Sequence, residues 1–167
     1  MPELPEVETV RLALDREFVG KRLSGVEART ASLRAPIPIR QLQQLLIGQC
    51  LLGIRRRAKY LLWDFSDAQV MLLHLGMTGH LRKSAGRAKW FPHDHLLLRF
   101  ADTTLLFLND VRRFGRVAVF QQAQEPQHIL LESLGVEPLE TSFTGTWLFQ
   151  KTREIKKPIK NWLIDSH

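Results

Sequence analysis

Cysteine is nearly absent from this 167-residue sequence, which contains a single one, Cys50. One cysteine excludes a disulfide within the chain and a zinc site built from several cysteine ligands. Long apolar runs are also missing, and none approaches the ~20 residues that a bilayer-spanning helix requires. The first residues, MPELPEVETV, carry acids and prolines where a signal peptide has a basic stretch and an apolar core. We therefore expect a cytoplasmic protein with no membrane partner.

Acidic residues are outnumbered, with 17 Asp and Glu against 24 Lys and Arg, and the formal net charge is +7. Hydrophobic residues make up 44% of the chain and charged residues 25%, values typical of a globular protein. This composition excludes the collagen-like and wholly disordered classes. A basic chain of this length favours one domain or slightly more, with a polyanion as a candidate partner.

The first segment has the pattern of an amphipathic helix. Pro5 suits the first helical turn, where a missing N–H has no consequence, and Gly20 is a suitable stop. Apolar residues recur at helical spacing and predict one buried stripe. The stripe comprises Val7, Val10, Leu14 and Phe18.

From Lys21 to Phe120 the pattern is mostly strand-like, and several runs are continuously apolar, as in the core of a β-sandwich. The exceptions are a short helix near Ile39–Leu46 and a basic loop, Lys83–Pro92, that we expect to be mobile. The predicted strands are Arg22–Arg29, Cys50–Arg57, Tyr60–Phe65, Gln69–Leu75, His95–Phe100, Thr104–Leu108 and Arg116–Phe120. The predicted hairpin turns are Ser66-Asp67 and Ala101-Asp102.

After Gln121 the pattern becomes helical. The predicted helices are His128–Leu134, Thr144–Arg153 and Lys156–Asp165. The last one is amphipathic, so its apolar face needs a partner. The whole pattern predicts an α+β fold that is mainly β: a two-sheet β-sandwich with an N-terminal helix and short C-terminal helices.

Pro2 is the first candidate for chemistry. Removal of Met1 would leave Pro2 with a free secondary amine, and an α-amino group has a pKa of about 7.7–8.0. The neutral amine can form a Schiff base with an aldehyde carbon, and Glu3 and Glu6 add acid–base groups beside it. The alternatives are that Pro2 occurs at the start of the chain by chance, without a chemical role, and that the glutamates only match the helix dipole.

Cationic motifs follow two of the predicted strands. The block Arg55–Lys59 suits phosphate contacts, with a solvated loop as the alternative. In Asp110–Gly115, an arginine can hydrogen-bond a base edge and Phe114 can enter a base step. Met77 is a second possible wedge, although Met and Phe are more often core residues.

Histidines recur at His74, His80, His93 and His95, but no cysteine set or helical histidine pair accompanies them. We expect no metal, and DNA-facing or hydrogen-bonded structural roles instead. The strand spacing of His93 and His95 predicts that both rings share one face. A metal-dependent nuclease built on these two residues is an alternative function.

Ordered motifs across essentially the whole chain resemble the formamidopyrimidine-DNA glycosylase/endonuclease VIII family. They are Met1–Thr9, Arg56–Leu61, His74–Gly79, His93–His95, Asp110–Gly115 and Leu134–Leu139. The resemblance implies a bifunctional glycosylase and abasic-site lyase of base excision repair that flips oxidised purines such as 8-oxoguanine and formamidopyrimidines. It implies damaged double-stranded DNA as the partner, a monomer in the bacterial cytoplasm, and no cofactor.

The resemblance also implies roles for single residues. Pro2 would attack C1′ and form the Schiff base, and Glu3 would protonate the sugar ring oxygen and shuttle protons during β- and δ-elimination. Glu6 would support the site, and Lys59 would hold phosphate beside the lesion. The implied DNA-binding residues are Arg57, His74, Met77, His93, Arg112, Arg113, Phe114, Lys156 and Lys160.

Among these DNA-binding residues, Met77, Arg112 and Phe114 match the family's set that fills the gap left by the flipped base, with Arg112 facing the orphan cytosine. The resemblance divides the chain into a catalytic β-sandwich over residues 1–135 and a linker with the start of a helix–two-turn–helix module over residues 136–167. The rest of that module, the base-covering loop and the four-cysteine zinc finger have no counterpart in the sequence. We therefore expect base excision to be weakened or lost and residual lyase action at preformed abasic sites, with a non-catalytic damaged-DNA-binding remnant as the alternative.

Overall fold

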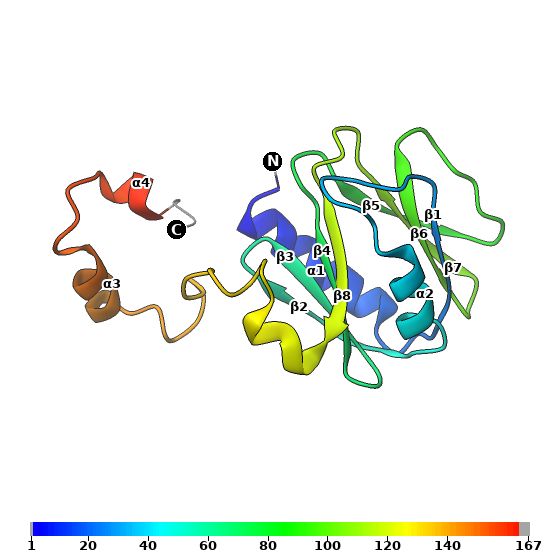
Figure 1. Ribbon diagram of the computed structural model, residues 1–167, viewed down its shortest axis with the longest axis horizontal. Helices are drawn as coiled ribbons and strands as arrows, with labels where there is room; N and C mark the ends of the chain where they lie inside the picture. The colour runs from blue at the N-terminus through cyan, green and yellow to red at the C-terminus, as the bar shows by residue number, and fades with distance from the viewer. Residues whose placement is uncertain (1, 164–167) are drawn as a thin grey trace. The chain divides into compact units, whose positions relative to one another are not determined.

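The computed structural model describes residues 2–163 of the chain. Contacts divide the chain into two compact units, Met1–Gln124 and Glu125–His167. Within the described residues, the first unit contains every strand, and the prediction of an α+β, mainly β fold is confirmed (Figure 1). The functional boundary after residue 135 rests on the family resemblance and stays a prediction.

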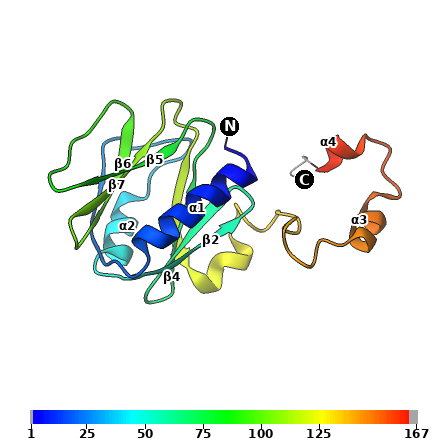
Figure 2. The same cartoon turned by 180° about the vertical axis from the view of Figure 1, so that it is seen from behind.

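Helix α1 spans Leu4–Phe18 and packs its predicted apolar stripe into the core, beside strands β2 and β3 (Figure 2). The buried residues of the stripe are Val7, Leu14 and Phe18, and Val10 packs against them partly buried. Gly20 follows the helix with a φ of 86°, a left-handed conformation that glycine adopts without steric penalty. The helix therefore begins and ends where the sequence indicates.

The strands form two antiparallel four-stranded sheets, with the orders β1-β6-β7-β5 and β2-β3-β4-β8. Helix α2 (Ile39–Leu46) packs against β1 and β4. The strands are β1 (Leu23–Ala28), β2 (Leu51–Arg57), β3 (Tyr60–Phe65), β4 (Gln69–His74), β5 (His80–Ala85), β6 (Asp94–Phe100), β7 (Thr104–Asn109) and β8 (Arg116–Gln121).

One hydrophobic core lies between the two sheets. Trp63 of β3 and Leu98 of β6 belong to the same buried cluster, which also takes in the stripe of α1. Phe18 at the end of α1 lies 6.4 Å from the ring centroid of Trp63 and 5.0 Å from that of Phe100. The sheets and the helix thus form a rigid scaffold beneath the loops at the strand ends.

The predicted loop Lys83–Pro92 begins too early, because β5 occupies residues up to Ala85. β5 is an edge strand that pairs only with β7, so its HLRKSA sequence needs little apolar alternation. Residues 86–92, here called the strap, then pack on the outer face of the sheet through Ala88 and Trp90. The sheet residues that the strap covers are Leu97, Leu105 and Phe107.

The second unit contains only helices and turns among its described residues. The helix predicted at Thr144–Arg153 is confirmed as α3 (Gly145–Thr152), whose Trp147 N–H donates to Thr144 Oγ1 at 3.0 Å. The helix predicted at His128–Leu134 is wrong: that segment forms consecutive turns after the 3₁₀ helix η1 (Gln122–Gln127).

In the turn segment, the Leu130 N–H donates to His128 Nδ1 at 3.3 Å, and the Leu131 N–H donates to the His128 carbonyl at 2.7 Å, a turn bond between residues three apart. Within the predicted Lys156–Asp165, helix α4 covers Ile159–Leu163, and the residues after Leu163 lie outside the described part of the chain. No helix between residues 2 and 163 is both long and apolar enough to cross a membrane.

Candidate functional site

The predicted acid–base residues lie together at the start of α1. Pro2 is half-buried directly before the helix, and the Glu3 backbone N–H donates to Glu6 Oε2 at 3.1 Å, as in a capping box. Lys59 Nζ approaches from the β2–β3 turn and lies 2.5 Å from Glu3 Oε2. Glu3 follows Pro2 in the chain and contacts both Glu6 and Lys59, so candidate residues from two distant segments lie together.

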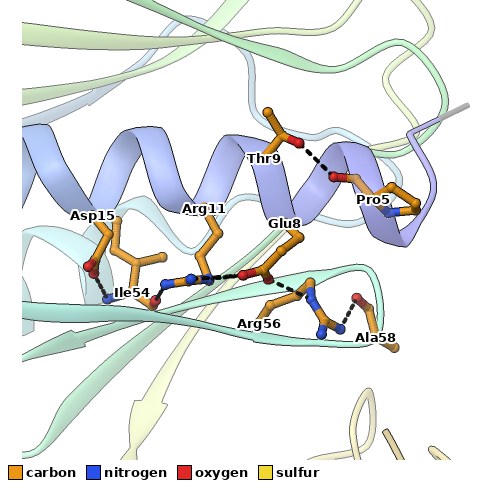
Figure 3. A network of polar contacts seen from close by, with 8 residues as sticks. All are labelled: Pro5, Glu8, Thr9, Arg11, Asp15, Ile54, Arg56 and Ala58. Carbon is orange, nitrogen blue, oxygen red and sulfur yellow. Dashed lines mark hydrogen bonds and ion pairs between the residues drawn. The ribbon is translucent and has the colours of Figure 1, made fainter. Parts of the chain in front are cut away.

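A polar network joins α1 to β2 and holds the helix start at this position (Figure 3). Glu8 accepts hydrogen bonds from Arg11 and Arg56, each at 2.8 Å, and Arg56 also donates to the Ala58 carbonyl. The hydrogen bond from Arg11 outweighs the opposing effect of burial and, with help from Arg56, lowers the pKa of Glu8 below its usual range. Asp15 accepts from the Ile54 N–H at 3.0 Å further along the helix.

This network changes the interpretation of the basic block Arg55–Lys59. Arg56 is only 8% exposed and is bound to Glu8, while Arg55 forms an ion pair with Asp64 at 2.7 Å. Two of these cations thus stabilise the fold through paired carboxylates. Sequence analysis missed Glu8 as the partner of Arg56, because a glutamate near the start of a helix is explained equally well by the helix dipole.

His74 ends β4 beside the Lys59 turn, and its ring lies 4.9 Å from that of Tyr60. The Gly76 N–H donates to His74 Nδ1 at 3.1 Å, which leaves Nε2 as the position of the proton in the neutral ring. Burial lowers the pKa of His74, and the positive charges of Lys59, Arg116 and Arg34 lower it further. The ring is therefore a neutral N–H donor at neutral pH.

Buried Asp110 connects the two loops that carry the predicted wedge residues. Its Oδ1 accepts from Thr78 Oγ1 at 2.6 Å, and its Oδ2 accepts from the Gly115 N–H at 2.8 Å. Thr78 Oγ1 in turn accepts from the Arg112 N–H at 3.2 Å. One fully buried carboxylate and one hydroxyl thus tie the Met77 loop to the loop 110–115.

The side chains on these loops are presented outward. Met77 is 39% exposed, and Arg112 is exposed with its guanidinium carbon 4.7 Å from the centroid of the half-buried Phe114 ring. The loops touch where Gly76, with a φ of 64°, faces the Phe114–Gly115 backbone. The structure therefore brings Met77, Arg112 and Phe114 together, and sequence analysis did not identify Asp110 and Thr78 as their supports.

His93 and His95 occupy different environments. His95 is buried, and its Nε2 lies 2.9 Å from the Asp110 carbonyl oxygen, whereas His93 is exposed and precedes β6 with a φ of 68°. Their strand spacing does not apply, because β6 begins only at Asp94. A cavity of about 270 Å³ lies here. Its lining residues are Arg29, Thr30, Pro92, His93, Asp94, His95 and Arg113.

The remaining predicted residues are less informative. Arg57 is half-buried at the end of β2, and Lys156 and Lys160 are exposed in the second unit. Across residues 2–163 no group of three or more His, Cys, Asp or Glu side chains could hold a metal ion. Cys50 directs its Sγ toward the Gly20 carbonyl at 3.3 Å, so the residues present do not fit a four-cysteine zinc finger.

Comparison with known families and sequences gives consistent results. A model of the formamidopyrimidine-DNA glycosylase N-terminal domain matches residues 1–117. Formamidopyrimidine-DNA glycosylases from Geobacter metallireducens and Stenotrophomonas maltophilia are 45% and 46% identical over 99% of this chain. The alignments cover 61% and 60% of those proteins, so the chain spans about three fifths of their length.

Solved structures show the same similarity. The Lactococcus lactis formamidopyrimidine-DNA glycosylase bound non-covalently to DNA with an abasic site superposes with a TM-score of 0.87 at 35% identity. The superposition covers 97% of this chain and 62% of that one. A mutant of the same enzyme in complex with Fapy-dG DNA gives a TM-score of 0.86 at 35% identity, over 97% of this chain and 59% of that one.

Proposed function

This chain belongs to the formamidopyrimidine-DNA glycosylase family, and from that premise we propose that it acts on damaged double-stranded DNA in base excision repair. The proposed activity is abasic-site lyase action through the Pro2 amine.

The contact that carries this proposal is the Lys59–Glu3 pair beside Pro2. A nearby acid–base group assists an amine nucleophile, and a lysine beside it can hold the substrate phosphate. Glu3 lies next to Pro2 in the chain, and the 2.5 Å contact between Lys59 and Glu3 supplies both groups at one point. Glu6 supports the arrangement by accepting the Glu3 N–H, which restrains the backbone beside the amine.

The proposed reaction starts when the Pro2 nitrogen attacks C1′ of the open abasic sugar. Glu3 donates a proton to the C1′ hydroxyl, which leaves as water, and a C1′=N iminium forms. The Glu3 carboxylate then takes a C2′ proton, and β-elimination expels the 3′ phosphate. Loss of the C4′ proton expels the 5′ phosphate by δ-elimination, and water hydrolyses the iminium and frees the Pro2 amine. These steps use only water and groups of the protein and the substrate, so we propose no cofactor.

The proposed DNA grip in this unit uses the two loops joined by Asp110. Met77, Arg112 and Phe114 project together from a rigid base, which suits insertion into the gap left by an extruded nucleotide. His74 offers a neutral N–H donor to a phosphate beside Lys59. Arg57, Arg113, His93, Lys156 and Lys160 are proposed as additional backbone contacts.

Borohydride trapping on a duplex with one abasic site tests the proposal. The chain that begins at Pro2 should form a covalent adduct, and peptide mapping should place the adduct on Pro2. A matched control carries two extra residues, Gly-Ser, before Pro2; it keeps the fold, but its amine lies away from Glu3 and should not trap. Lys59→Ala should reduce trapping while leaving thermal unfolding nearly unchanged, because the Lys59–Glu3 pair is solvent-accessible.

The same experiment separates lyase activity from binding alone. If the chain does not trap while a full-length relative does, the lyase proposal is refuted. Salt-dependent binding to a tetrahydrofuran-containing duplex would then support a DNA-binding role without catalysis. An adduct that maps to a lysine in place of Pro2 would also contradict the assignment.

A further inference from the structure

Asp94 is a fully buried carboxylate next to His93, and the proposed chemistry does not use it. Its side chain has no exposed surface, and its oxygens accept three hydrogen bonds. The donors are Arg82 at 2.6 Å, the Phe91 N–H at 2.8 Å and Asn109 Nδ2 at 2.9 Å. Burial alone would raise the pKa of Asp94, but these donors outweigh it, and the pKa lies below its ordinary value.

Arg82 balances this buried charge and is itself enclosed by the strap. Its guanidinium carbon lies 4.3 Å from the ring centroid of Phe91 and 4.2 Å from that of Phe107. It also donates to the Lys89 carbonyl at 3.1 Å. Trp90 packs edge-on against Phe107 at 5.2 Å. The ion pair therefore fastens the strap, residues 86–92, to the outer face of the sheet.

The same network fixes the backbone on both sides of His93. Asn109 Nδ2 also donates to the Pro92 carbonyl at 2.8 Å, and the Asp94 N–H donates to the Phe91 carbonyl at 3.2 Å. The His93 carbonyl accepts from the Asp110 N–H at 3.0 Å. His93 itself has a φ of 68°, a conformation that is uncommon for residues other than glycine and that its surroundings must impose.

The geometry points to Asp94 as a positioning residue: with Arg82 and Asn109 it holds the turn 91–94 so that His93 faces the cavity shared with Arg29 and Arg113. The consequence of this inference for DNA binding rests on the proposed function, in which His93 contacts the DNA backbone. Asp94 does not touch DNA; it acts through the shape of the turn. Arg82 and Asn109 share this role because they supply the donors that keep the carboxylate ionised and in place.

A local measurement tests the positioning role without DNA. In Asp94→Asn, amide hydrogen exchange at Asp110, whose N–H bonds the His93 carbonyl, should accelerate roughly tenfold relative to its intrinsic rate. Exchange at Gly115, whose N–H bonds the Asp110 carboxylate, should stay unchanged. Equal acceleration at both amides, or none at Asp110, would overturn the inference.

A milder variant covers the case in which Asp94→Asn does not fold. Asn109→Ala removes the hydrogen bonds from Asn109 Nδ2 to the Pro92 carbonyl and to Asp94 but leaves the Arg82–Asp94 pair. It should therefore also accelerate amide exchange at Asp110. Leu46→Ala, a core change in α2, is the matched control: it lowers global stability but should not single out the Asp110 amide.

A double-mutant cycle with a tetrahydrofuran-containing duplex tests the functional consequence. His93→Ala and Asn109→Ala should each weaken binding by roughly threefold to tenfold, and the double variant should be hardly weaker than either. Asn109→Ala combined with Lys59→Ala should instead be additive. Additive losses with His93→Ala would overturn the inference. If the unmodified chain does not bind, the proposed function fails, while the exchange measurement still decides the positioning role.

Discussion

The contact between the Met77 loop and the 110–115 loop can be tested by adding one methyl group. A Cβ built on Gly76 would lie 2.5 Å from the Phe114 carbonyl carbon, 2.6 Å from the Gly115 nitrogen and 2.8 Å from the Phe114 oxygen. All three atoms belong to the backbone, so no side chain can rotate away. Gly76→Ala therefore requires the two loops to separate.

Gly86 provides a matched control for this change. It has a φ of 73°, close to the 64° of Gly76, but a Cβ there meets nothing within 4 Å. Both substitutions carry the left-handed cost of about 1–2 kcal/mol for an L-residue, and both restrict the unfolded chain equally. Only Gly76→Ala adds the overpacking cost of about 1–3 kcal/mol.

Urea denaturation followed by far-ultraviolet circular dichroism measures the difference. The free energy of unfolding of Gly76→Ala should lie below that of Gly86→Ala by about 1–3 kcal/mol. Under the proposed function, Gly76→Ala should also weaken binding to a tetrahydrofuran-containing duplex, since Met77 would move relative to Phe114. Equal stability of the two variants, within about 0.5 kcal/mol, would refute the close approach of the loops.

Further predictions concern the hydrogen bonds and charges of the site. Thr78→Val should lower the free energy of unfolding by about 1–3 kcal/mol, because it removes the hydroxyl that bonds Asp110, and Thr78→Ser should restore most of it. In an NMR titration, the His74 pKa should fall below the ordinary ~6.5, with the proton on Nε2 in the neutral ring. Burial favours the neutral His74 ring, so the stability of the folded state that depends on this residue should be fully present above the ordinary pKa of ~6.5. It should be lost as the pH falls through the lower pKa of the folded state, and His74→Phe should reduce this loss. Arg56→Ala should lower the free energy of unfolding by about 1–3 kcal/mol in chemical denaturation, whereas Arg55→Ala, which breaks a more exposed pair, should change it by less than about 1 kcal/mol.

Local pattern predicted most of the fold correctly. The stripe of α1 and the apolar strands are confirmed because each was specified by its own periodicity. There are two exceptions. β5 is a polar edge strand that is stabilised by pairing with β7 and not marked by its own periodicity, and His128–Leu134 forms turns.

The candidate site was less accessible to sequence reasoning. The Pro2–Glu3–Glu6 cluster could be identified because its members are adjacent in the chain. Asp110 and Asp94 could not be recognised as supports, because an aspartate beside a strand looks the same whether it is buried or solvated. Only the packing of loops from distant strands leaves these carboxylates without solvent and surrounds them with donors.

The sequence by itself determined the class of fold, the helix at the start and the family to which the chain belongs, because these depend on periodicity and on the order of motifs. The tertiary structure decided which charges remain at the surface. Arg56 and Arg82 bind buried or partly buried carboxylates, while Lys59 reaches Glu3 at the accessible start of α1. The physical reason is that an ion pair requires two groups to meet in space, and residues as far apart in the chain as Glu8 and Arg56 meet only when the helix packs on the sheet.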